Sequence, residues 1–296
     1  EENKDIVKTG RTHLQDATPI AFSQEISGWR SSLEKDVELL KLTVEPLKAL
    51  ALGGTAVGTG LNAPEGFDVK VAEKVSALTG KNFVTAENKF HALTSKDELV
   101  FAHGAIKALA CDMMKIANDV RWLASGPRDG LGEIFIPENE PGSSIMPGKV
   151  NPVIPEVMNQ ICYKVIGNDL CVAMSSEAAQ MELNAMEPVM AQCCFESAAI
   201  MMNGFDTLRI NCVDGIIANV EQCDKYIHSS FGVVTALNPV IGYKYSTRIA
   251  KEAMATGKSI YDLVLEHDIL SKEDLDTILS PENMIKPVKL DIKVKE

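Results

Sequence analysis

Apolar residues recur along this 296-residue chain at steps of three and four, the spacing that places them on one face of an α-helix. The first such stretch begins at Ala21 and runs to Pro46, whose ring kinks or ends a helix. Between residues 98 and 124, two rows of apolar positions repeat every seven residues, as in helices that pack lengthwise against long partners. The rows are Leu99, Ile106, Met113 and Val120, and Ala102, Leu109, Ile116 and Leu123.

Further long helices are expected in the second half of the chain. We expect helices to begin at Pro155 and Pro188, because proline is favoured in the first turn of a helix, and a third near Asn219. Helices of about 25 residues would each be roughly 40 Å long at 1.5 Å per residue. The pattern therefore predicts an all-α protein built on an elongated bundle of long helices.

The composition changes near residue 237, where short helices with their own caps follow the long ones. Ser259 and Ser271 each precede an aspartate by three residues, which is the spacing of a helix N-cap. The sequence thus predicts two domains, a central helical bundle over residues 1–237 and a small helical domain over residues 238–296.

Other stretches show no helical period. Residues 1–9 have the character of a helix end, and residues 81–93 are predicted to form a loop. A glycine-rich link at residues 53–60 does not follow a buried strand, so it lacks the context of a dinucleotide site. We expect no cofactor.

The composition excludes several classes of protein. A formal charge of −12 at pH 7 argues against nucleic acid as a partner, because a phosphate backbone attracts basic surfaces. No apolar run is long enough to span a membrane. Seven cysteines without CxxC spacing predict neither a zinc site nor a disulfide framework. We therefore expect a cytoplasmic protein with no membrane partner and no bound metal.

The most informative stretch is a long loop between residues 125 and 155, rich in glycine and proline. A loop of this length in a compact domain is usually functional or disordered. Within it, residues 142–152 read GSSIMPGKVNP, which places paired hydroxyls beside glycine and then adds a cation and an amide. By composition alone, this string also fits a serine–glycine turn with a solvated lysine.

The string at residues 142–152, hereafter the signature loop, resembles the signature of the fumarase/aspartase superfamily. These lyases eliminate water or an amine from a small dicarboxylate. Residues 10–19, GRTHLQDATP, resemble a second region of the same family. The resemblance implies a small dicarboxylate substrate and a homotetramer whose active sites are shared between subunits.

The resemblance also implies roles for residues of the signature loop. Ser143 would be the base that removes a proton from the carbon next to a carboxylate, provided that neighbouring donors and positive charge lower its pKa. Lys149 and Asn151 would hold the carboxylate that gains charge, and Ser144 would also bind substrate. The segment from Pro141 to Gly148 would close over the substrate.

Residues outside the loop complete the expected site. By resemblance, Thr12 and His13 would bind the second carboxylate and the leaving-group end, and Glu156 would hydrogen-bond His13 and keep it charged. The family carries a third region, Ser-Ser-Asn-Asp followed by Pro-Thr, before the equivalent of Gly10, and this chain begins after it. We therefore expect an N-terminally truncated form, or one piece, of a longer polypeptide.

The two halves of the sequence favour different members of the family. Residues 81–152 look more like fumarate hydratases, whereas the chain from Val153 onward, including LNAMEP at residues 183–188, looks like aspartate ammonia-lyase. We predict an aspartate ammonia-lyase that releases ammonia from L-aspartate to give fumarate. The alternative is a fumarate hydratase that interconverts fumarate and L-malate. A third interpretation is a helical scaffold without activity, although the intact signature loop argues against it.

Overall fold

The computed structural model describes residues 3–140, 142–289 and 292. Most of them are helical and the strands are short, which confirms the predicted all-α class. Contacts divide the chain into two compact units, each treated by itself below. Unit 1 comprises residues 1–30, 123–135 and 216–296, and unit 2 comprises residues 31–122 and 136–215. The expected domain boundary at residue 237 remains a prediction.

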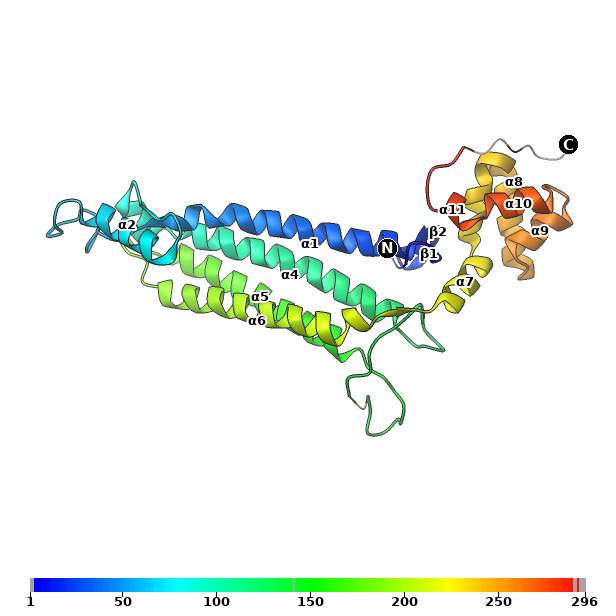
Figure 1. The fold of residues 1–296 in the computed structure, drawn as a ribbon, viewed down its shortest axis with the longest axis horizontal. Coiled ribbons are helices and arrows are strands. Elements are labelled where there is room, and N and C mark those ends of the chain that lie inside the picture. The colour runs from blue at the N-terminus through cyan, green and yellow to red at the C-terminus, as the bar shows by residue number, and fades with distance from the viewer. Residues whose placement is uncertain (1–2, 141, 290–291, 293–296) are drawn as a thin grey trace. The chain divides into compact units, whose positions relative to one another are not determined.

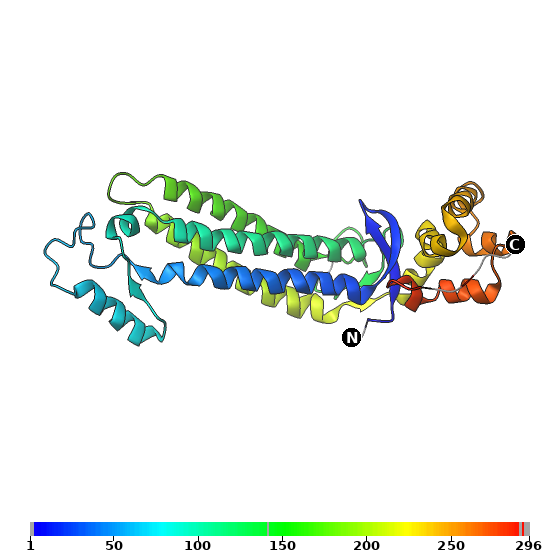
Figure 2. The same cartoon turned by 90° about the horizontal axis from the view of Figure 1, so that it is seen from above.

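Unit 2 is built on long helices that run side by side (Figures 1 and 2). The part of α1 (Phe22–Val44) within this unit lies along α4 (Asp97–Leu123). Helix α5 (Val153–Glu177) packs against α6 (Glu187–Asn211). These four helices form the lengthwise bundle that the apolar pattern predicted.

Several predicted features of the long helices are confirmed, some with shifted bounds. The apolar rows of α4 include Met113, Val120 and Leu123, which are almost fully buried. Helix α6 has Pro188 as its second residue, as expected. Helix α5 begins two residues before Pro155, so this proline still lies in the first turn, where its missing N–H leaves no hydrogen bond unmade.

Smaller elements lie at one end of the bundle in unit 2. Strands β3 (Ala49–Leu50) and β4 (Val84–Thr85) pair in parallel, and α2 (Phe67–Thr79) lies between them in sequence. The prediction of a loop over residues 81–93 is wrong in its second half, because α3 (Lys89–Thr94) begins there. Asn88 caps this helix, and its Oδ1 accepts a hydrogen bond from the backbone N–H of His91 at 3.0 Å.

Unit 1 begins with an antiparallel hairpin of β1 (Val7–Thr12) and β2 (Gln15–Ala21), and α7 (Val220–Ser229) packs against β1. The prediction that residues 1–9 end a helix is therefore wrong for residues 3–9, and Glu1 and Glu2 lie outside the described residues. The strand alternation was hidden because Lys8, an inward position, is charged yet almost fully buried.

A second strand pair and a helical cluster complete unit 1. Strand β5 (Ile134–Phe135) pairs with β6 (Ile217–Ala218). The C-terminal helices pack around one buried apolar cluster. They are α8 (Val234–Thr256), α9 (Ile260–Glu266), α10 (Lys272–Ile278) and α11 (Pro281–Met284). Both predicted caps are confirmed, because Ser259 and Ser271 accept hydrogen bonds from the backbone N–H groups of Asp262 and Asp274 at 3.0 and 3.1 Å.

Candidate active site

Thr12 and His13 lie at the tip of the β1–β2 hairpin in unit 1. Only two residues, His13 and Leu14, join the strands, and their φ angles are +54° and +59°. A two-residue loop with left-handed backbone at both positions is the type I′ geometry, which matches the twist of the flanking strands. The side chains of Thr12, His13 and Leu14 are exposed, so the hairpin holds a histidine and a hydroxyl where a ligand can reach them.

Below its tip, the hairpin is tied to the rest of unit 1 by buried charges. Arg11 Nη1 lies 2.9 Å from both carboxylate oxygens of Glu133, which is fully buried. Lys8 Nζ lies 3.2 Å from Glu133 and 3.1 Å from Glu25. The Arg11 guanidinium also lies over the Tyr226 ring, 5.4 Å from its centroid. Each buried charge thus has an opposite partner, without which burial would be strongly unfavourable.

The signature loop in unit 2 folds back on itself around Ser143. The Ser143 Oγ accepts hydrogen bonds from the backbone N–H groups of Ile145 and Met146, at 3.1 and 3.0 Å. Donors to a hydroxyl oxygen favour its deprotonated form, so this arrangement can stabilise an alkoxide. The Ser143 side chain is half-buried, whereas that of Ser144 is exposed.

Asn151 closes the signature loop, because its Nδ2 donates a hydrogen bond to the carbonyl oxygen of Gly142. Lys149 is exposed, and its backbone N–H donates to the carbonyl of Met146 at 3.3 Å. The loop therefore gathers the predicted base, the predicted cation and the predicted amide in one short segment. Pro141, the first residue of the predicted lid, lies outside the described residues.

Glu156 lies in the first turn of α5, where a carboxylate is favoured by the helix dipole. Its Oε1 is 3.6 Å from Nη2 of Arg121, whose Nη1 donates to Oδ1 of Asn118 at 3.0 Å. The implied hydrogen bond from Glu156 to His13 joins residues of different units and remains a prediction. Thr12 and His13 lie in unit 1, and the other predicted site residues lie in unit 2.

The sequence interpretation missed the buried charges that hold the hairpin. Arg11 had a usable signal, because it stands beside Thr12 within the family-like stretch. Glu133 had none, because it is 122 positions from its partner Arg11 and stands in a glycine-rich loop. A glutamate in such a loop is ordinarily solvated, so its burial could not be inferred from the sequence.

The buried cysteines are poor nucleophiles. Burial raises the pKa of the Cys162 thiol to about 12 and the pKa values of Cys212 and Cys223 to about 11. The nearby Glu133 carboxylate adds to the shift at Cys223. These thiols therefore stay protonated at neutral pH, and the thiolate is the reactive form.

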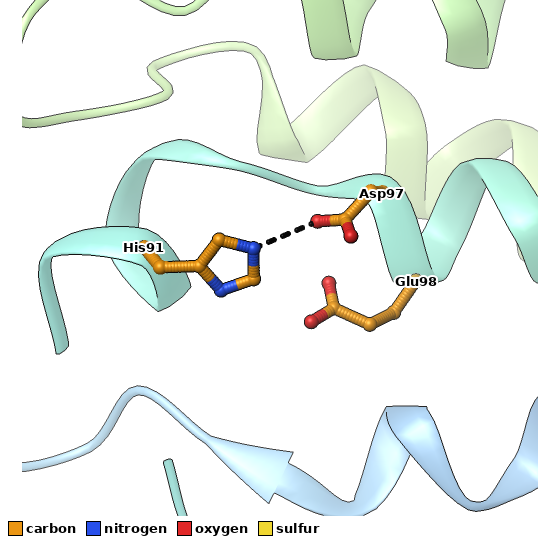
Figure 3. A group of neighbouring side chains, drawn as sticks. All are labelled: His91, Asp97 and Glu98. Carbon is orange, nitrogen blue, oxygen red and sulfur yellow. Dashed lines mark ion pairs between the residues drawn. The ribbon is translucent and has the colours of Figure 1, made fainter. Parts of the chain in front are cut away.

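One surface cluster has the donor atoms of a metal site. His91 of α3 and the first-turn residues Asp97 and Glu98 of α4 bring a ring nitrogen and two carboxylates within 4.8 Å of one another (Figure 3). His91 Nε2 lies 3.2 Å from Asp97 Oδ1. A hydrogen bond from Ser95 is the main cause that lowers the pKa of Asp97. Because first-turn carboxylates are favoured by the helix dipole alone, the cluster by itself does not establish a metal site.

A buried group in unit 2 has the order of a hydrolase triad. Ser197 Oγ lies 2.9 Å from His103 Nε2, and His103 Nδ1 lies 3.1 Å from Asp169 Oδ1. Both Ser197 and His103 are fully buried, and Asn168 Nδ2 also donates to Ser197 at 3.0 Å. Because packed helices enclose the serine, the group serves to connect α4, α5 and α6.

A cavity of about 430 Å³ lies in unit 1, between the start of β1 and helices α7, α9, α10 and α11. Its walls are mainly apolar, with Asp224, His228 and Tyr261 among the polar lining residues. The predicted site residues, all of which the structure describes, are not among those that line it.

Comparisons with known proteins identify the family. The profile of a family described as lyase matches residues 1–167, and a profile described as fumarase C C-terminus matches residues 233–286. The chain belongs to this lyase family, within the fumarase/aspartase superfamily.

Curated relatives and solved structures resemble the chain along nearly its whole length. A protein named class II fumarate hydratase from Helicobacter pylori is 51% identical over 284 residues, which cover 96% of this chain and 61% of the relative. One of the same name from Bacillus subtilis is 48% identical over 283 residues, with coverage of 96% and 61%.

Two solved structures share the fold. A class II fumarase from Schistosoma mansoni has a TM-score of 0.88 at 35% identity, with coverage of 96% of this chain and 62% of that one. A fumarate lyase:delta crystallin from Brucella melitensis bound to cobalt has a TM-score of 0.92 at 40% identity, with coverage of 97% and 62%. The chain spans about three fifths of the length of these relatives.

The relatives overturn the predicted ammonia-lyase. Proteins about half identical to this chain are named fumarate hydratase, so the prediction of a carbon–nitrogen lyase acting on aspartate is wrong. It relied on residues 153–160, which begin α5, and on residues 183–188, which end the connection from α5 and begin α6. There Asn184 is buried, its Nδ2 donates to the carbonyl of Ser175 at 3.1 Å and its Oδ1 accepts from the N–H of Met186 at 2.8 Å. The motif therefore shapes a helix connection, which explains its presence without any reference to the leaving group.

Proposed function

We propose that this chain, within its complete polypeptide, is a fumarate hydratase that interconverts fumarate and L-malate. The observation that carries the proposal is an intact signature loop in a chain that is 51% identical, over 96% of its length, to a protein named class II fumarate hydratase. The resemblance of residues 81–152 supports the same activity. This is the alternative that the sequence left open, now favoured by the relatives.

In the direction from malate to fumarate, Ser143 Oγ accepts the proton from the carbon next to one carboxylate. The backbone N–H groups of Ile145 and Met146 favour the alkoxide form that this step requires. The electron pair of the broken C–H bond moves into the adjacent carboxylate and forms a doubly charged aci-carboxylate. Lys149 and Asn151 stabilise this developing charge with a cation and an amide donor.

The bond from the neighbouring carbon to its hydroxyl then breaks, the hydroxyl takes a proton from the charged His13 and leaves as water, and the double bond of fumarate forms. Thr12 and His13 bind the second carboxylate and the leaving-group end, and Glu156 supports the charge of His13. The atoms balance without an oxidant or reductant. Hydration of fumarate follows the same steps in reverse, with Ser143 returning the proton to carbon.

We also propose a homotetramer in which Thr12 and His13 of one chain meet Ser143 and Lys149 of another. Support comes from large apolar side chains that α5 and α6 leave exposed, because their burial against further helices would stabilise an assembly by about 25 cal/mol per Å². They include Tyr163, Leu170, Met174, Phe195, Met202 and Ile210. Sedimentation of the complete polypeptide should give a tetramer at micromolar concentration, and a folded monomer would exclude this arrangement.

Location and metal dependence complete the proposal. In the described part of the chain, every helix is too short or too polar to cross a bilayer. We place the protein in the cytoplasm, and cell fractionation tests this.

Activity should persist after dialysis against a chelator, since each step above uses side chains and backbone groups alone.

The deciding experiment is an assay of the complete polypeptide with fumarate, L-malate and L-aspartate in separate reactions. We expect fumarate to be consumed with formation of an equal amount of malate, and no fumarate to form from aspartate. The Ser143→Ala variant is the control for a contaminating enzyme. Activity on none of the three substrates would favour the scaffold interpretation instead.

A further inference from the structure

The most deeply buried carboxylate among the described charges belongs to Glu133, which is fully buried and contacts two cations within 3.2 Å. One of them, Arg11, immediately precedes Thr12 and His13 on β1. The mechanism proposed above assigns no role to Glu133 or Arg11. The question is what this ion pair does for Thr12 and His13, which follow Arg11 in the sequence.

Glu133 is itself held independently of the hairpin. Its backbone N–H donates to the carbonyl of Leu123, the last residue of α4, at 2.8 Å. Its carbonyl accepts the N–H of Asn219, the N-cap of α7, at 2.8 Å, and the thiol of Cys223 at 3.8 Å. The carboxylate thus projects from backbone that two helix ends hold in place.

Arg11 is held on several sides. One nitrogen, Nη1, contacts both oxygens of Glu133 and lies 3.4 Å from the carbonyl oxygen of Thr9. The guanidinium lies over the Tyr226 ring, and the Tyr226 hydroxyl donates to the carbonyl of Gly130 at 3.1 Å. A planar cation held this way has little freedom, so the strand that carries it is fixed at that point.

The hairpin has a structural irregularity at the same place. The register pairs Thr9 with Pro19 but Arg11 with Asp16, a shift of one residue. Between them, a Cβ added at Gly10 would lie 2.5 Å from the carbonyl oxygen of Thr18, so only glycine fits. Bulges of this kind re-aim the residues that follow and are frequent beside active sites. A re-aimed tip needs an anchor beyond the bulge, and Arg11 is the charged residue in that position.

We propose that Glu133 is a positioning residue, which fixes the direction of the Thr12–His13 tip by holding Arg11. This proposal rests on the proposed function for its kinetic readout. The adjoining pair, Lys8 and Glu25, lies before the bulge and joins the base of the hairpin to α1. Each pair joins one positive and one negative side chain. The Lys8–Glu25 pair is therefore a charge-matched control for the Arg11–Glu133 pair.

The test compares two charge-neutral double variants of the complete polypeptide. Arg11→Gln with Glu133→Gln removes the anchor beyond the bulge and leaves Lys8 paired with Glu25. Lys8→Gln with Glu25→Gln removes the pair before the bulge and leaves the anchor intact. Each variant replaces one cation and one carboxylate of the same network with two amides, so a purely structural role would affect both variants. Circular dichroism confirms that both are folded at the assay temperature.

We expect the first double variant to lose roughly 10–10²-fold in kcat/KM for fumarate, because misplacement of binding groups by about 1 Å has effects of that size. Amide hydrogen exchange should rise in residues 10–16. The control variant should stay within about 3-fold of the unmodified protein, with unchanged exchange at the tip. If the first variant does not fold, Arg11→Lys retains the charge without the forked guanidinium and should shift both readouts in the same direction by less.

Equal losses in both double variants would reduce the network to general stability and overturn the proposal. Unchanged kinetics and unchanged exchange in the Arg11/Glu133 variant would overturn it as well. Failure of the unmodified polypeptide to hydrate fumarate would instead contradict the proposed function. In that case, exchange at residues 10–16 still decides whether Glu133 holds the tip.

Discussion

The hairpin and the signature loop carry the predicted site residues, and they are held in opposite ways. The hairpin has paired strands and buried opposite charges below its tip. The hydrogen bonds of the signature loop lie mainly within the loop itself. They run from the backbone N–H groups of Ile145 and Met146 to Ser143 and from the Asn151 side chain to Gly142. One region is thus preorganised and the other can adapt. A site that must bind charge and also admit substrate needs both properties.

The signature loop also exposes large apolar side chains. Ile145 is 86% exposed. Met146 next to it is also exposed. Burying such side chains when the loop closes would stabilise the closed form by about 1.5–3 kcal/mol each. Burial of these side chains would therefore favour closure of the loop.

Removing the base should have the largest effect and should locate the chemistry in the adaptable region. Ser143→Ala is expected to lower kcat by about 10²–10⁴-fold, with KM changed much less, because it removes the proton acceptor and leaves Lys149 and Asn151 in place. Steady-state kinetics with malate measure this. The neighbouring Ser144→Ala removes a predicted binding hydroxyl and should change KM more than kcat, so an equal loss of kcat in both variants would argue against Ser143 as the base.

The two units also differ in the charges they bury. Unit 1 pairs Lys8 with Glu133, whereas unit 2, besides its own ion pairs, places two carboxylates against each other, Asp36 of α1 and Asp112 of α4. Burial, followed by the charge of Asp112 and a hydrogen bond with it, raises the pKa of Asp36 from 3.8 to about 6. A folded pKa above the unfolded one contributes stability that is fully present below pH 3.8 and is lost as pH rises through 6.

Asp36→Asn should therefore raise the free energy of unfolding at pH 7.5 by up to about 3 kcal/mol, from two pKa units at about 1.4 kcal/mol each. The gain should vanish toward pH 4, where the native aspartate is already protonated. Urea titrations at several pH values measure the difference. A gain that does not depend on pH would show that the carboxylate is not the cause.

Ligand binding should separate the two regions more directly. A dicarboxylate at 100 times its Kd stabilises the bound form by about 2.7 kcal/mol, so amide exchange in residues 142–150 should slow by up to about 100-fold. Exchange in residues 7–12, which pair in the free hairpin, should change far less. Hydrogen exchange with and without fumarate measures both segments at once. Equal protection of the two would remove the distinction between a fixed and an adaptable half.

The sequence predicted the features that depend on local pattern. The seven-residue rows of α4 and the caps at Ser259 and Ser271 are visible within a few turns of chain, whereas the chemistry of the signature loop remains a prediction. The hairpin was missed because its inward Lys8 is neutralised by Glu25 and Glu133, which are distant in sequence. Contacts of that kind depend on the completed fold.

The prediction that L-aspartate is the substrate was wrong for a related reason. Residues 183–188 were interpreted as a marker of the leaving group, although Asn184 satisfies backbone groups at a helix connection. Residues 81–152, which include the signature loop, looked more like fumarate hydratases, in agreement with the names of the relatives. Similarity in a connection between helices reflects packing. Similarity in the segment that holds the predicted catalytic residues is more informative about the reaction.

The smallest effect concerns the tip of the hairpin. Leu14 has a φ of +59° and is 58% exposed, so its side chain adds strain without much burial. Left-handed backbone is unfavourable by roughly 1–2 kcal/mol for a residue with a Cβ, and glycine escapes this at some entropic cost in the unfolded chain. Leu14→Gly should therefore stabilise the protein by about 0.5–1 kcal/mol, since glycine is also favoured at the second position of a type I′ turn. Thermal unfolding measures the change, with Leu14→Ala as the control that keeps the Cβ. A gain with alanine equal to that with glycine would mean that removal of the exposed leucine, and not relief of backbone strain, is responsible.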